Sequence, residues 1–173
     1  MRADETFTIL IRPQLPGLYR LSYRLTGTVP DAEDLLQELL IKVYQRRDEV
    51  LRIESLRAWL TRVLYTLFID MKRHQGRSPL YLAVDNSEDA IDPVDSLTNE
   101  HVNEPEAALI LDAEQQRLVS AMDQLGEDHR VVIILADIEG YSFKEMEDIL
   151  DCPQGTLKSR LHRARARLRE ILE

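Results

Sequence analysis

The sequence predicts an all-α protein made of two small helical domains. Helix-forming residues dominate the 173-residue chain, which has only 6 Gly and 6% aromatic residues, and strand-like alternation is hard to find. Hydrophobic residues make up 44% of the chain and charged residues 31%, which is typical of a folded protein. An acidic, proline-containing segment over residues 78–105 separates two helix-rich stretches. We therefore expect domains at residues 1–77 and 106–173.

The segment between the two domains has the composition of a linker. Residues 78–105 contain three prolines and seven acidic residues but no Lys or Arg. Such a segment buries little apolar surface and repels itself, so we expect it to be extended and flexible. The net charge is +3 over residues 1–77, −16 over residues 78–151 and +4 over residues 152–173. The two ends are thus mildly basic although the whole chain carries −9, and a ligand docking on one end responds to the local field.

Apolar residues between positions 6 and 23 predict the first helix. Pro13 and Pro16 interrupt this stretch, so we expect two pieces. The second piece is predicted to end near Gly27, because glycine readily adopts the left-handed conformation that ends helices.

Two longer helices follow in the N-terminal domain. Residues 31–45 predict a strongly amphipathic helix with Asp31 as its N-cap. Its apolar stripe consists of Leu35, Leu39 and Val43. Residues 55–74 predict the longest helix of the chain, and a basic last turn followed by Gly76 predicts its end.

Four helices are expected after the linker. The first two are predicted over residues 106–125 and 128–139, and each is followed by a glycine. The third, over residues 142–150, opens with a Ser-x-x-Glu capping box. A tight turn at residues 151–153 then leads into the final helix, which is predicted over residues 153–171 with its proline at the first helical position.

The last two helices match a helix-turn-helix with a basic second helix. The buried stripe of the final helix consists of Leu157, Leu161, Ala164 and Leu168. The opposite face presents Gln154, Lys158, Ser159, His162 and Arg163. Lys and Arg attract phosphates and donate to guanine, whereas Gln and Ser bond to base edges. The sequence therefore predicts that this helix binds duplex DNA.

Several other classes of protein do not fit the sequence. The glycines lie too far apart for a phosphate-binding loop, and the longest apolar run, residues 131–136, is too short to cross a bilayer. The N-terminus lacks the pattern of a secretory signal. A single cysteine, Cys152, excludes an internal disulfide and a Cys-paired zinc site. We expect a cytoplasmic protein without metal, cofactor or direct membrane insertion.

The C-terminal motif resembles a known family. Residues 140–165 resemble region 4 of extracytoplasmic-function (ECF) sigma factors of bacterial RNA polymerase, whose pattern reads roughly G-x-S-x-x-E-I-A and then C-P-x-G-T-V-K-S-R-L-x-R-A-R. Residues 31–38 resemble the region 2 helix that grips the polymerase β′ clamp. Residues 57–60 and 69–73 resemble the part of region 2 that opens and reads the −10 element. The resemblance covers almost the whole chain in the family's order.

The resemblance implies a non-enzymatic role in transcription initiation. Residues 1–77 would be region 2, which docks on core polymerase and captures the melted −10 strand. Residues 106–173 would be region 4, which reads the −35 element as duplex, and residues 78–105 would thread the RNA-exit path. The implied partners are RNA polymerase core, through its β′ clamp and β flap, promoter DNA and an anti-sigma factor.

The resemblance also carries site residues over to positions of this chain. The positions implied for −35 recognition are Gln154, Thr156, Lys158, Ser159, Arg160, His162 and Arg163. Those implied for −10 recognition are Arg62, Thr66, Asp70, Lys72 and Arg73. Those implied for core binding are Asp31, Asp34, Leu35, Gln37 and Glu38. The family often has Asn at the position of Thr66, and a hydroxyl replaces an amide that offers both a donor and an acceptor.

Two functions from other classes stay open at this point. One is a free-standing helix-turn-helix repressor that dimerises on a palindrome. Tight binding to duplex DNA without polymerase would favour this function. The other is an enzyme that uses Cys152 or one of the four histidines, which lost turnover in Cys152→Ser would favour. The histidines are His74, His101, His129 and His162, and none stands in a His-Glu-x-x-His motif.

Overall fold

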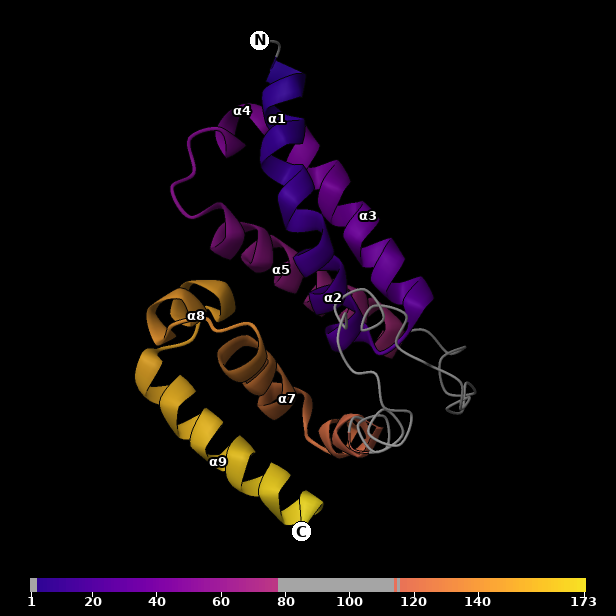
Figure 1. Cartoon of the computed structure of the whole chain (residues 1–173), viewed down its shortest axis with the longest axis vertical. Helices are drawn as coiled ribbons and strands as arrows, with labels where there is room; N and C mark the ends of the chain where they lie inside the picture. The colour runs from indigo at the N-terminus through magenta and orange to yellow at the C-terminus, as the bar shows by residue number, and fades with distance from the viewer. Residues whose placement is uncertain (1–2, 78–113, 115) are drawn as a thin grey trace, which may run out of the picture. The chain divides into compact units, whose positions relative to one another are not determined.

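The computed structural model describes residues 3–77, 114 and 116–173 (Figure 1). These residues form helices and turns without any strand, so the predicted all-α class is confirmed. By their contacts the described residues divide into two compact units. The predicted linker and the first part of the helix predicted over residues 106–125 lie outside the described residues.

The first stretch forms two helices, as its prolines predict. Helix α1 spans Ala3–Ile11, a 3₁₀ turn, η1, spans Arg12–Gln14, and α2 spans Leu15–Thr26. The prolines occupy η1 and the first turn of α2, where a missing N–H costs nothing. Helix α2 ends at Gly27, whose φ of 82° is left-handed, so this predicted end is also confirmed.

Helix α3 spans Val29–Gln45 and begins earlier than the sequence pattern predicts. Its N-cap is Thr28, so the prediction of Asp31 as the cap was wrong. The Thr28 Oγ1 accepts a hydrogen bond from the Asp31 N–H at 3.3 Å and donates one to the Asp31 carboxylate at 2.9 Å. The physical reason is Pro30, which lies in the first turn, where its fixed φ favours the helix and its missing N–H is not needed.

The rest of the N-terminal unit contains a short helix that was not predicted and one that is longer than predicted. Helix α4 spans Arg47–Val50, and α5 spans Leu56–Arg77. Gly76 lies inside α5 and does not adopt a left-handed φ, so it does not end the helix as predicted. A glycine within a helix costs only about 1 kcal/mol relative to alanine, which a long packed helix tolerates.

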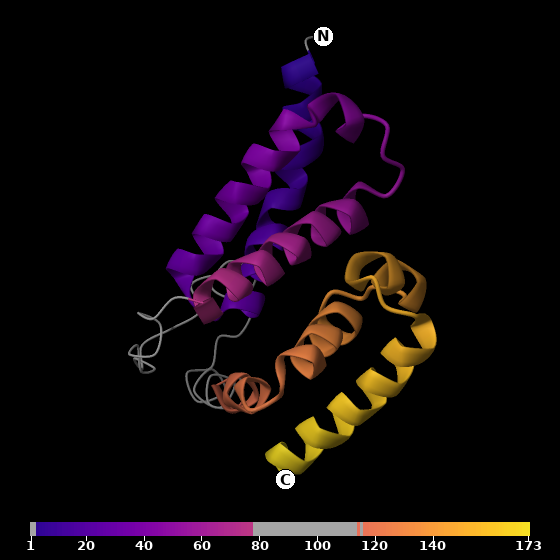
Figure 2. The same cartoon turned by 180° about the vertical axis from the view of Figure 1, so that it is seen from behind.

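Helices α2, α3 and α5 lie against one another (Figures 1 and 2) and enclose one apolar core. Helix α2 packs on α3 and α5, α3 packs on α5, and α1 packs on α4. The largest buried side chains of this unit are Leu21, Leu35, Leu39, Leu60, Leu64, Leu67 and Phe68. Ser22 is also buried, and its hydroxyl donates to the Leu18 carbonyl oxygen at 2.9 Å. The core thus leaves the outer faces of α3 and α5 available to partners.

The C-terminal unit begins, in the described residues, with a helix over residues 116–123. Helix α7 spans Glu127–Ile133 and continues as a π-helical turn, η4, over Ile134–Ile138. Within the turn the Glu139 N–H donates to the Ile134 carbonyl oxygen at 2.8 Å. The predicted helix over residues 128–139 is therefore present, but its last turn is wider than an α-helix. Gly140 ends it with a left-handed φ of 71°.

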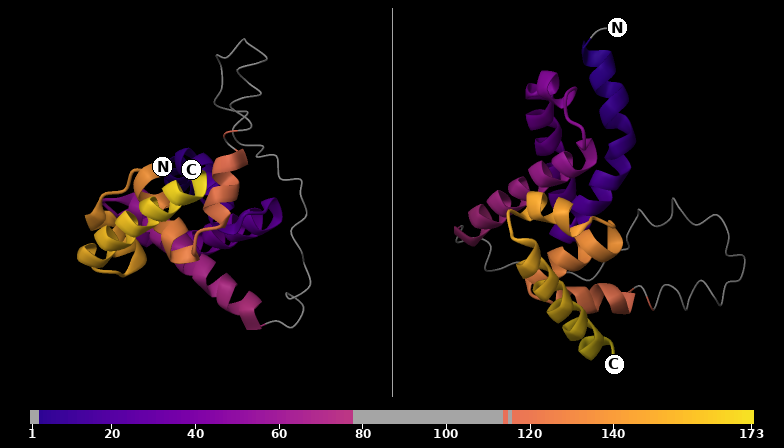
Figure 3. Two further views of the ribbon diagram at one scale, coloured as in Figure 1. Left: turned by 90° about the horizontal axis from the view of Figure 1, so that it is seen from below. Right: turned by 90° about the vertical axis from the view of Figure 1, so that its left-hand side faces the viewer.

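Helix α8 spans Phe143–Leu150 and α9 spans Gln154–Leu172 (Figure 3). The capping box predicted at the start of α8 is confirmed, because the Ser142 N–H donates to Glu145 Oε2 at 2.8 Å and Ser142 Oγ accepts from the Glu145 N–H at 3.3 Å. Asp151 turns the chain between the helices with a left-handed φ of 50°.

Pro153 is the N-cap of α9 and not its first helical residue, which corrects the prediction. Its ψ of 141° is extended, and its carbonyl oxygen accepts from the Leu157 N–H at 3.0 Å. Helix α9 packs on α7. Leu157, Leu161 and Ala164 of its predicted stripe are buried, and Leu168 is half-buried.

Candidate nucleic-acid interface

The N-terminal half of α9 carries an exposed polar and basic face. Five of the seven residues predicted to read duplex DNA are exposed there: Thr156, Lys158, Ser159, His162 and Arg163. Because Leu157, Leu161 and Ala164 are buried against the rest of the unit, the helix holds these polar side chains on its outer side. Such a helix can enter the major groove of duplex DNA.

The other two predicted residues are half-buried and held by neighbouring helices. Gln154 Nε2 donates to Glu147 Oε2 of α8 at 2.6 Å. Arg160 Nη1 lies 3.7 Å from Asp128 Oδ2 of α7. The structure thus does not place them with the exposed set: each connects α9 to another helix of the unit.

Local contacts order three of the exposed side chains. The Lys158 ammonium lies 5.6 Å from the centroid of the Phe143 ring, within the range of a cation–π contact. The Ser159 hydroxyl donates to the Thr156 carbonyl oxygen at 2.9 Å, so its oxygen still has lone pairs with which to accept. Arg163 Nε donates to the Ser159 carbonyl oxygen at 3.3 Å. These contacts restrict the side chains before any DNA binds.

Two of the later arginines of α9 are engaged within the unit. The Arg165 guanidinium forms two hydrogen bonds with the Asp137 carboxylate of η4, one of them from Nε to Oδ2 at 3.0 Å. The hydrogen bond to Asp137, and then the carboxylate charge, raise the pKa of Arg165, while slight burial lowers it. Arg167 lies 3.0 Å from Glu170 on the same helix. The basic run of α9 therefore divides into an exposed part in its N-terminal half and a later part in which Arg165 and Arg167 pair with carboxylates of the same unit.

Helix α5 brings four of its five predicted −10 residues to one face. Arg62, Thr66, Asp70 and Arg73 follow one another at helical spacing. Arg62, Thr66 and Arg73 are exposed, and Asp70 is half-buried with its carboxylate 3.5 Å from Arg73 Nη1. Thr66 Oγ1 donates to the Arg62 carbonyl oxygen at 2.9 Å, which leaves it as an acceptor.

Lys72 lies apart from that set. Its ammonium sits 5.7 Å from the centroid of the Phe68 ring, and Phe68 belongs to the buried side of α5. Its position, one residue before Arg73, turns it about 100° away around the helix. The structure therefore does not bring Lys72 together with the other −10 residues.

The outer face of α3 carries three of the five residues predicted to bind core polymerase. Asp34, Gln37 and Glu38 are exposed. Asp31 is half-buried and bonded to the N-cap, and Leu35 is only 2% exposed because it belongs to the core. The three exposed polar residues are therefore accessible to a partner, whereas the side chain of Leu35 is not.

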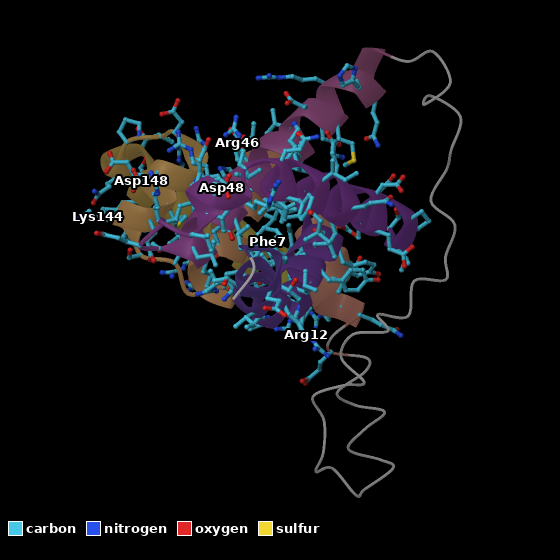
Figure 4. The ribbon with its side chains drawn as sticks, turned by 90° about the horizontal axis from the view of Figure 1, so that it is seen from above. Phe7, Arg12, Arg46, Asp48, Lys144 and Asp148 are labelled. Atoms are coloured by element: carbon cyan, nitrogen blue, oxygen red, sulfur yellow. The ribbon has the colours of Figure 1, made fainter. Side chains whose placement is uncertain are left out.

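Sequence reasoning missed two residues on that helix. Ile41 is 54% exposed and Tyr44 is 47% exposed, although both are large and apolar. Phe7 of α1 meets the Tyr44 ring edge-on, with the centroids 5.5 Å apart. Figure 4 labels Phe7, together with Arg46 and Asp48 at the end of α3 and in α4. The sequence could have revealed Ile41 and Tyr44, because both lie off the buried stripe of Leu35, Leu39 and Val43. An apolar residue off the buried stripe of a helix faces solvent.

Two further features bear on function. In the described part of the chain, no helix is long and apolar enough to span a membrane. Among the same residues, no three His, Cys, Asp or Glu side chains gather into a group that could hold a metal ion.

Comparison with known proteins matches both units to one family. The family model for Sigma-70 region 2 matches residues 10–78, and that for Sigma-70, region 4 matches residues 115–168. The chain is 34% identical over 163 residues to the ECF RNA polymerase sigma factor SigE of Mycolicibacterium smegmatis, covering 94% of this chain and 60% of that protein. It is 31% identical over 172 residues to the ECF RNA polymerase sigma factor SigW of Bacillus subtilis, covering 98% of this chain and 90% of SigW.

Solved structures agree with these relatives. The sigma factor RpoE of Bartonella quintana, crystallised in complex with the anti-sigma factor NepR, matches with a TM-score of 0.77 and 30% identity over 97% of each chain. CnrH, in complex with the cytosolic domain of CnrY, shares the fold with a TM-score of 0.64 and 21% identity, over 98% of this chain and 88% of CnrH. The resemblance seen in the sequence is thereby confirmed. The chain belongs to the ECF family of RNA polymerase sigma factors.

Proposed function

We propose that the chain binds RNA polymerase core and directs it to promoters by reading their −10 and −35 elements. The observation that carries the proposal is the exposed set on α9, namely Lys158, Ser159, His162 and Arg163, held outward in a helix-turn-helix. A single short recognition helix provides little affinity for duplex DNA, since most affinity comes from the number of phosphate contacts. Tight, specific binding therefore requires the polymerase and the second unit.

The −35 element is read by α9. Thr156, Lys158, Ser159, His162 and Arg163 reach the groove directly, and Arg163 is the residue best suited to donate to guanine O6 and N7. Arg160 acts through its ion pair with Asp128. Gln154 is held by Glu147 at its amide nitrogen only. This division of roles follows from exposure and from the hydrogen bonds within the unit.

The −10 element is captured as single-stranded DNA by α5. Arg62 and Arg73 supply charge for the backbone, and Thr66 offers a hydroxyl acceptor between them. Unstacking a base costs a few kcal/mol, which contacts to the extruded base must offset. Lys72 belongs to the edge of this surface, because it lies over Phe68.

Core polymerase is bound by the outer face of α3. Asp34, Gln37 and Glu38 supply hydrogen bonds and charge, and the exposed Ile41 supplies apolar area at the adjoining turn. We assign this face to the β′ clamp, and we assign contact with the β flap to the C-terminal unit. Leu35 contributes by packing in the core under this face.

The chain is divided accordingly into three functional parts. Residues 1–77 bind core and the −10 strand, residues 106–173 read the −35 duplex, and residues 78–105 link them as an acidic tether. Partial support comes from the family models, which match residues 10–78 and 115–168 and leave the acidic segment between them. The chain itself performs no bond chemistry, and it acts in the cytoplasm, where RNA polymerase works.

An anti-sigma factor controls the protein in this proposal. The support is the Bartonella quintana relative, whose structure is a complex with the anti-sigma factor NepR. The exposed apolar residues Ile41 and Tyr44 offer the kind of surface that an amphipathic partner covers. Occupation of that face by an anti-sigma factor would exclude core polymerase.

Run-off transcription with purified core polymerase tests the proposed function. The full chain is added to core and offered a pool of random-sequence templates, and the start sites are sequenced. We expect transcripts to start at defined sites preceded by shared −10 and −35 sequences. Tight binding of the chain to duplex DNA without polymerase, together with no initiation at any site, would instead identify a free-standing repressor.

A further inference from the structure

The two helices of the helix-turn-helix are joined by one short side-chain contact. Gln154 Nε2, at the start of α9, donates to Glu147 Oε2 of α8 at 2.6 Å, and both residues are half-buried. Partial burial protects the hydrogen bond from competing water and so holds the two side chains together.

The chemistry of the pair determines which way the Gln154 amide faces. A carboxylate only accepts hydrogen bonds, so the amide nitrogen has to face Glu147. The amide oxygen, Oε1, is then the acceptor that Glu147 does not engage. In the major groove adenine and cytosine present an exocyclic amine that donates to such an oxygen, whereas guanine and thymine present carbonyl oxygens.

We propose that Glu147 is a positioning residue for promoter choice: it orients Gln154 so that its Oε1 accepts from a base amine. The chain then prefers adenine or cytosine over guanine or thymine at one position of the −35 element. This inference rests on the proposed function, since it requires α9 to read duplex DNA.

The effect of removing the Glu147 charge distinguishes a positioning role from a purely structural role. A carboxylate near the DNA repels phosphates, so its removal does not weaken overall attraction to DNA. A purely structural residue, once removed, weakens initiation from all sequences alike. A positioning residue, once removed, changes the preferred base at a single position.

The test uses holoenzyme assembled from core polymerase and the full chain, on a template pool randomised over the −35 element. We compare wild type with Glu147→Ala, Glu147→Gln, Gln154→Ala and the double alanine variant. Asp148→Ala is the matched control, because it removes the same charge from the same helix (Figure 4). Circular dichroism confirms that each variant is folded.

We expect Glu147→Ala and Gln154→Ala to lose about fivefold of the preference at the same base position, the worth of one hydrogen bond. The double variant loses no more than either single one. Glu147→Gln weakens the preference, because an amide at position 147 can donate as well as accept and no longer fixes which end of the Gln154 amide faces it. Asp148→Ala keeps the preference.

Three outcomes would overturn the inference. Initiation by Glu147→Ala with wild-type base preferences would do so while leaving the proposed function intact. Unchanged preferences in Gln154→Ala would do the same, and this variant decides the matter if Glu147→Ala does not fold. Failure of the wild-type holoenzyme to initiate at any defined site would remove the proposed function and this inference with it.

Discussion

Arg165 of α9 and Asp137 of η4 form a two-point ion pair between residues 28 positions apart in the sequence. The arrangement is bidentate, with both Nε and Nη2 donating to the carboxylate. Such geometry adds direction to charge attraction, so the pair fixes how α9 crosses the end of the α7–η4 helix. The contact lies outside the exposed face that we propose reads DNA.

Asp137→Asn tests the contribution of this pair to stability. The Arg165 side chain is 57% exposed, so water screens the pair and we expect a loss of about 0.5–1 kcal/mol. Glu170→Gln, which breaks the exposed Arg167 pair, serves as the control and is expected to change less. Denaturant unfolding of the full chain measures both, and equal losses would contradict a special role for Asp137.

The pH dependence of the same pair follows from the raised pKa of Arg165. A raised pKa means that the stabilisation is complete below the unfolded-state pKa and is lost only as pH rises through the folded one. That window lies far above neutrality for an arginine. We expect the stability difference between wild type and Asp137→Asn to stay constant from about pH 7 to about pH 9. A difference that disappears over this range would contradict the assignment.

Ser142→Ala tests the capping box of α8. Removing the hydroxyl leaves the Glu145 N–H without its acceptor, and we expect a loss of about 1 kcal/mol in the free energy of unfolding. Ser159→Ala deletes the same group from the interior of α9, where alanine is a better helix former, so it should not destabilise. Chemical denaturation of the two variants provides the comparison.

Arg163→Ala tests the reading of the −35 element. The side chain is exposed in the N-terminal half of α9, and we expect its loss to weaken −35-dependent initiation by about 1–3 kcal/mol. Arg167→Ala is the matched control, because Arg167 pairs with Glu170 near the other end of the helix. Transcription is measured on templates with intact and scrambled −35 sequences, and equal output from both would contradict the assignment.

Asp34→Arg tests the polymerase-binding face of α3. The exposed carboxylate is replaced by the opposite charge, and we expect affinity for core to fall by about tenfold or more. Asp48→Arg makes the same charge change on an exposed carboxylate of α4, outside this face, and it should have a smaller effect. Core binding is measured by pull-down and titration, and unchanged binding by Asp34→Arg would remove the residue from the interface.

Leu35→Ala separates a core role from a contact role. The side chain is 2% exposed, so we expect a loss of about 2–5 kcal/mol in stability from the cavity it leaves. Thermal unfolding followed by circular dichroism measures this loss. A variant with unchanged stability but weaker core binding would restore Leu35 to the partner interface.

The features predictable from the sequence were those that depend on neighbours along the chain. The apolar stripe of α9, the capping box at Ser142 and the end of α2 at Gly27 all follow from spacings of a few residues. The errors lay where two local signals compete. Thr28 and Asp31 are both residue types that cap helices well, and Pro30 in the first turn favours Thr28. Gly76 is a residue type that often ends helices, but the packing of α5 extends the helix past it.

The fold class, the family and the residue types of α9 are predictable from the sequence, because periodicity and motif are properties of consecutive residues. Which of those side chains are exposed follows from the packing of the helices and is not predictable from the pattern along α9. The tertiary structure places Gln154 against Glu147, Arg160 against Asp128 and Arg165 against Asp137, and it buries Leu35. The physical reason is that burial and ion pairing depend on which helices pack together, and a pattern along one helix does not specify its neighbours.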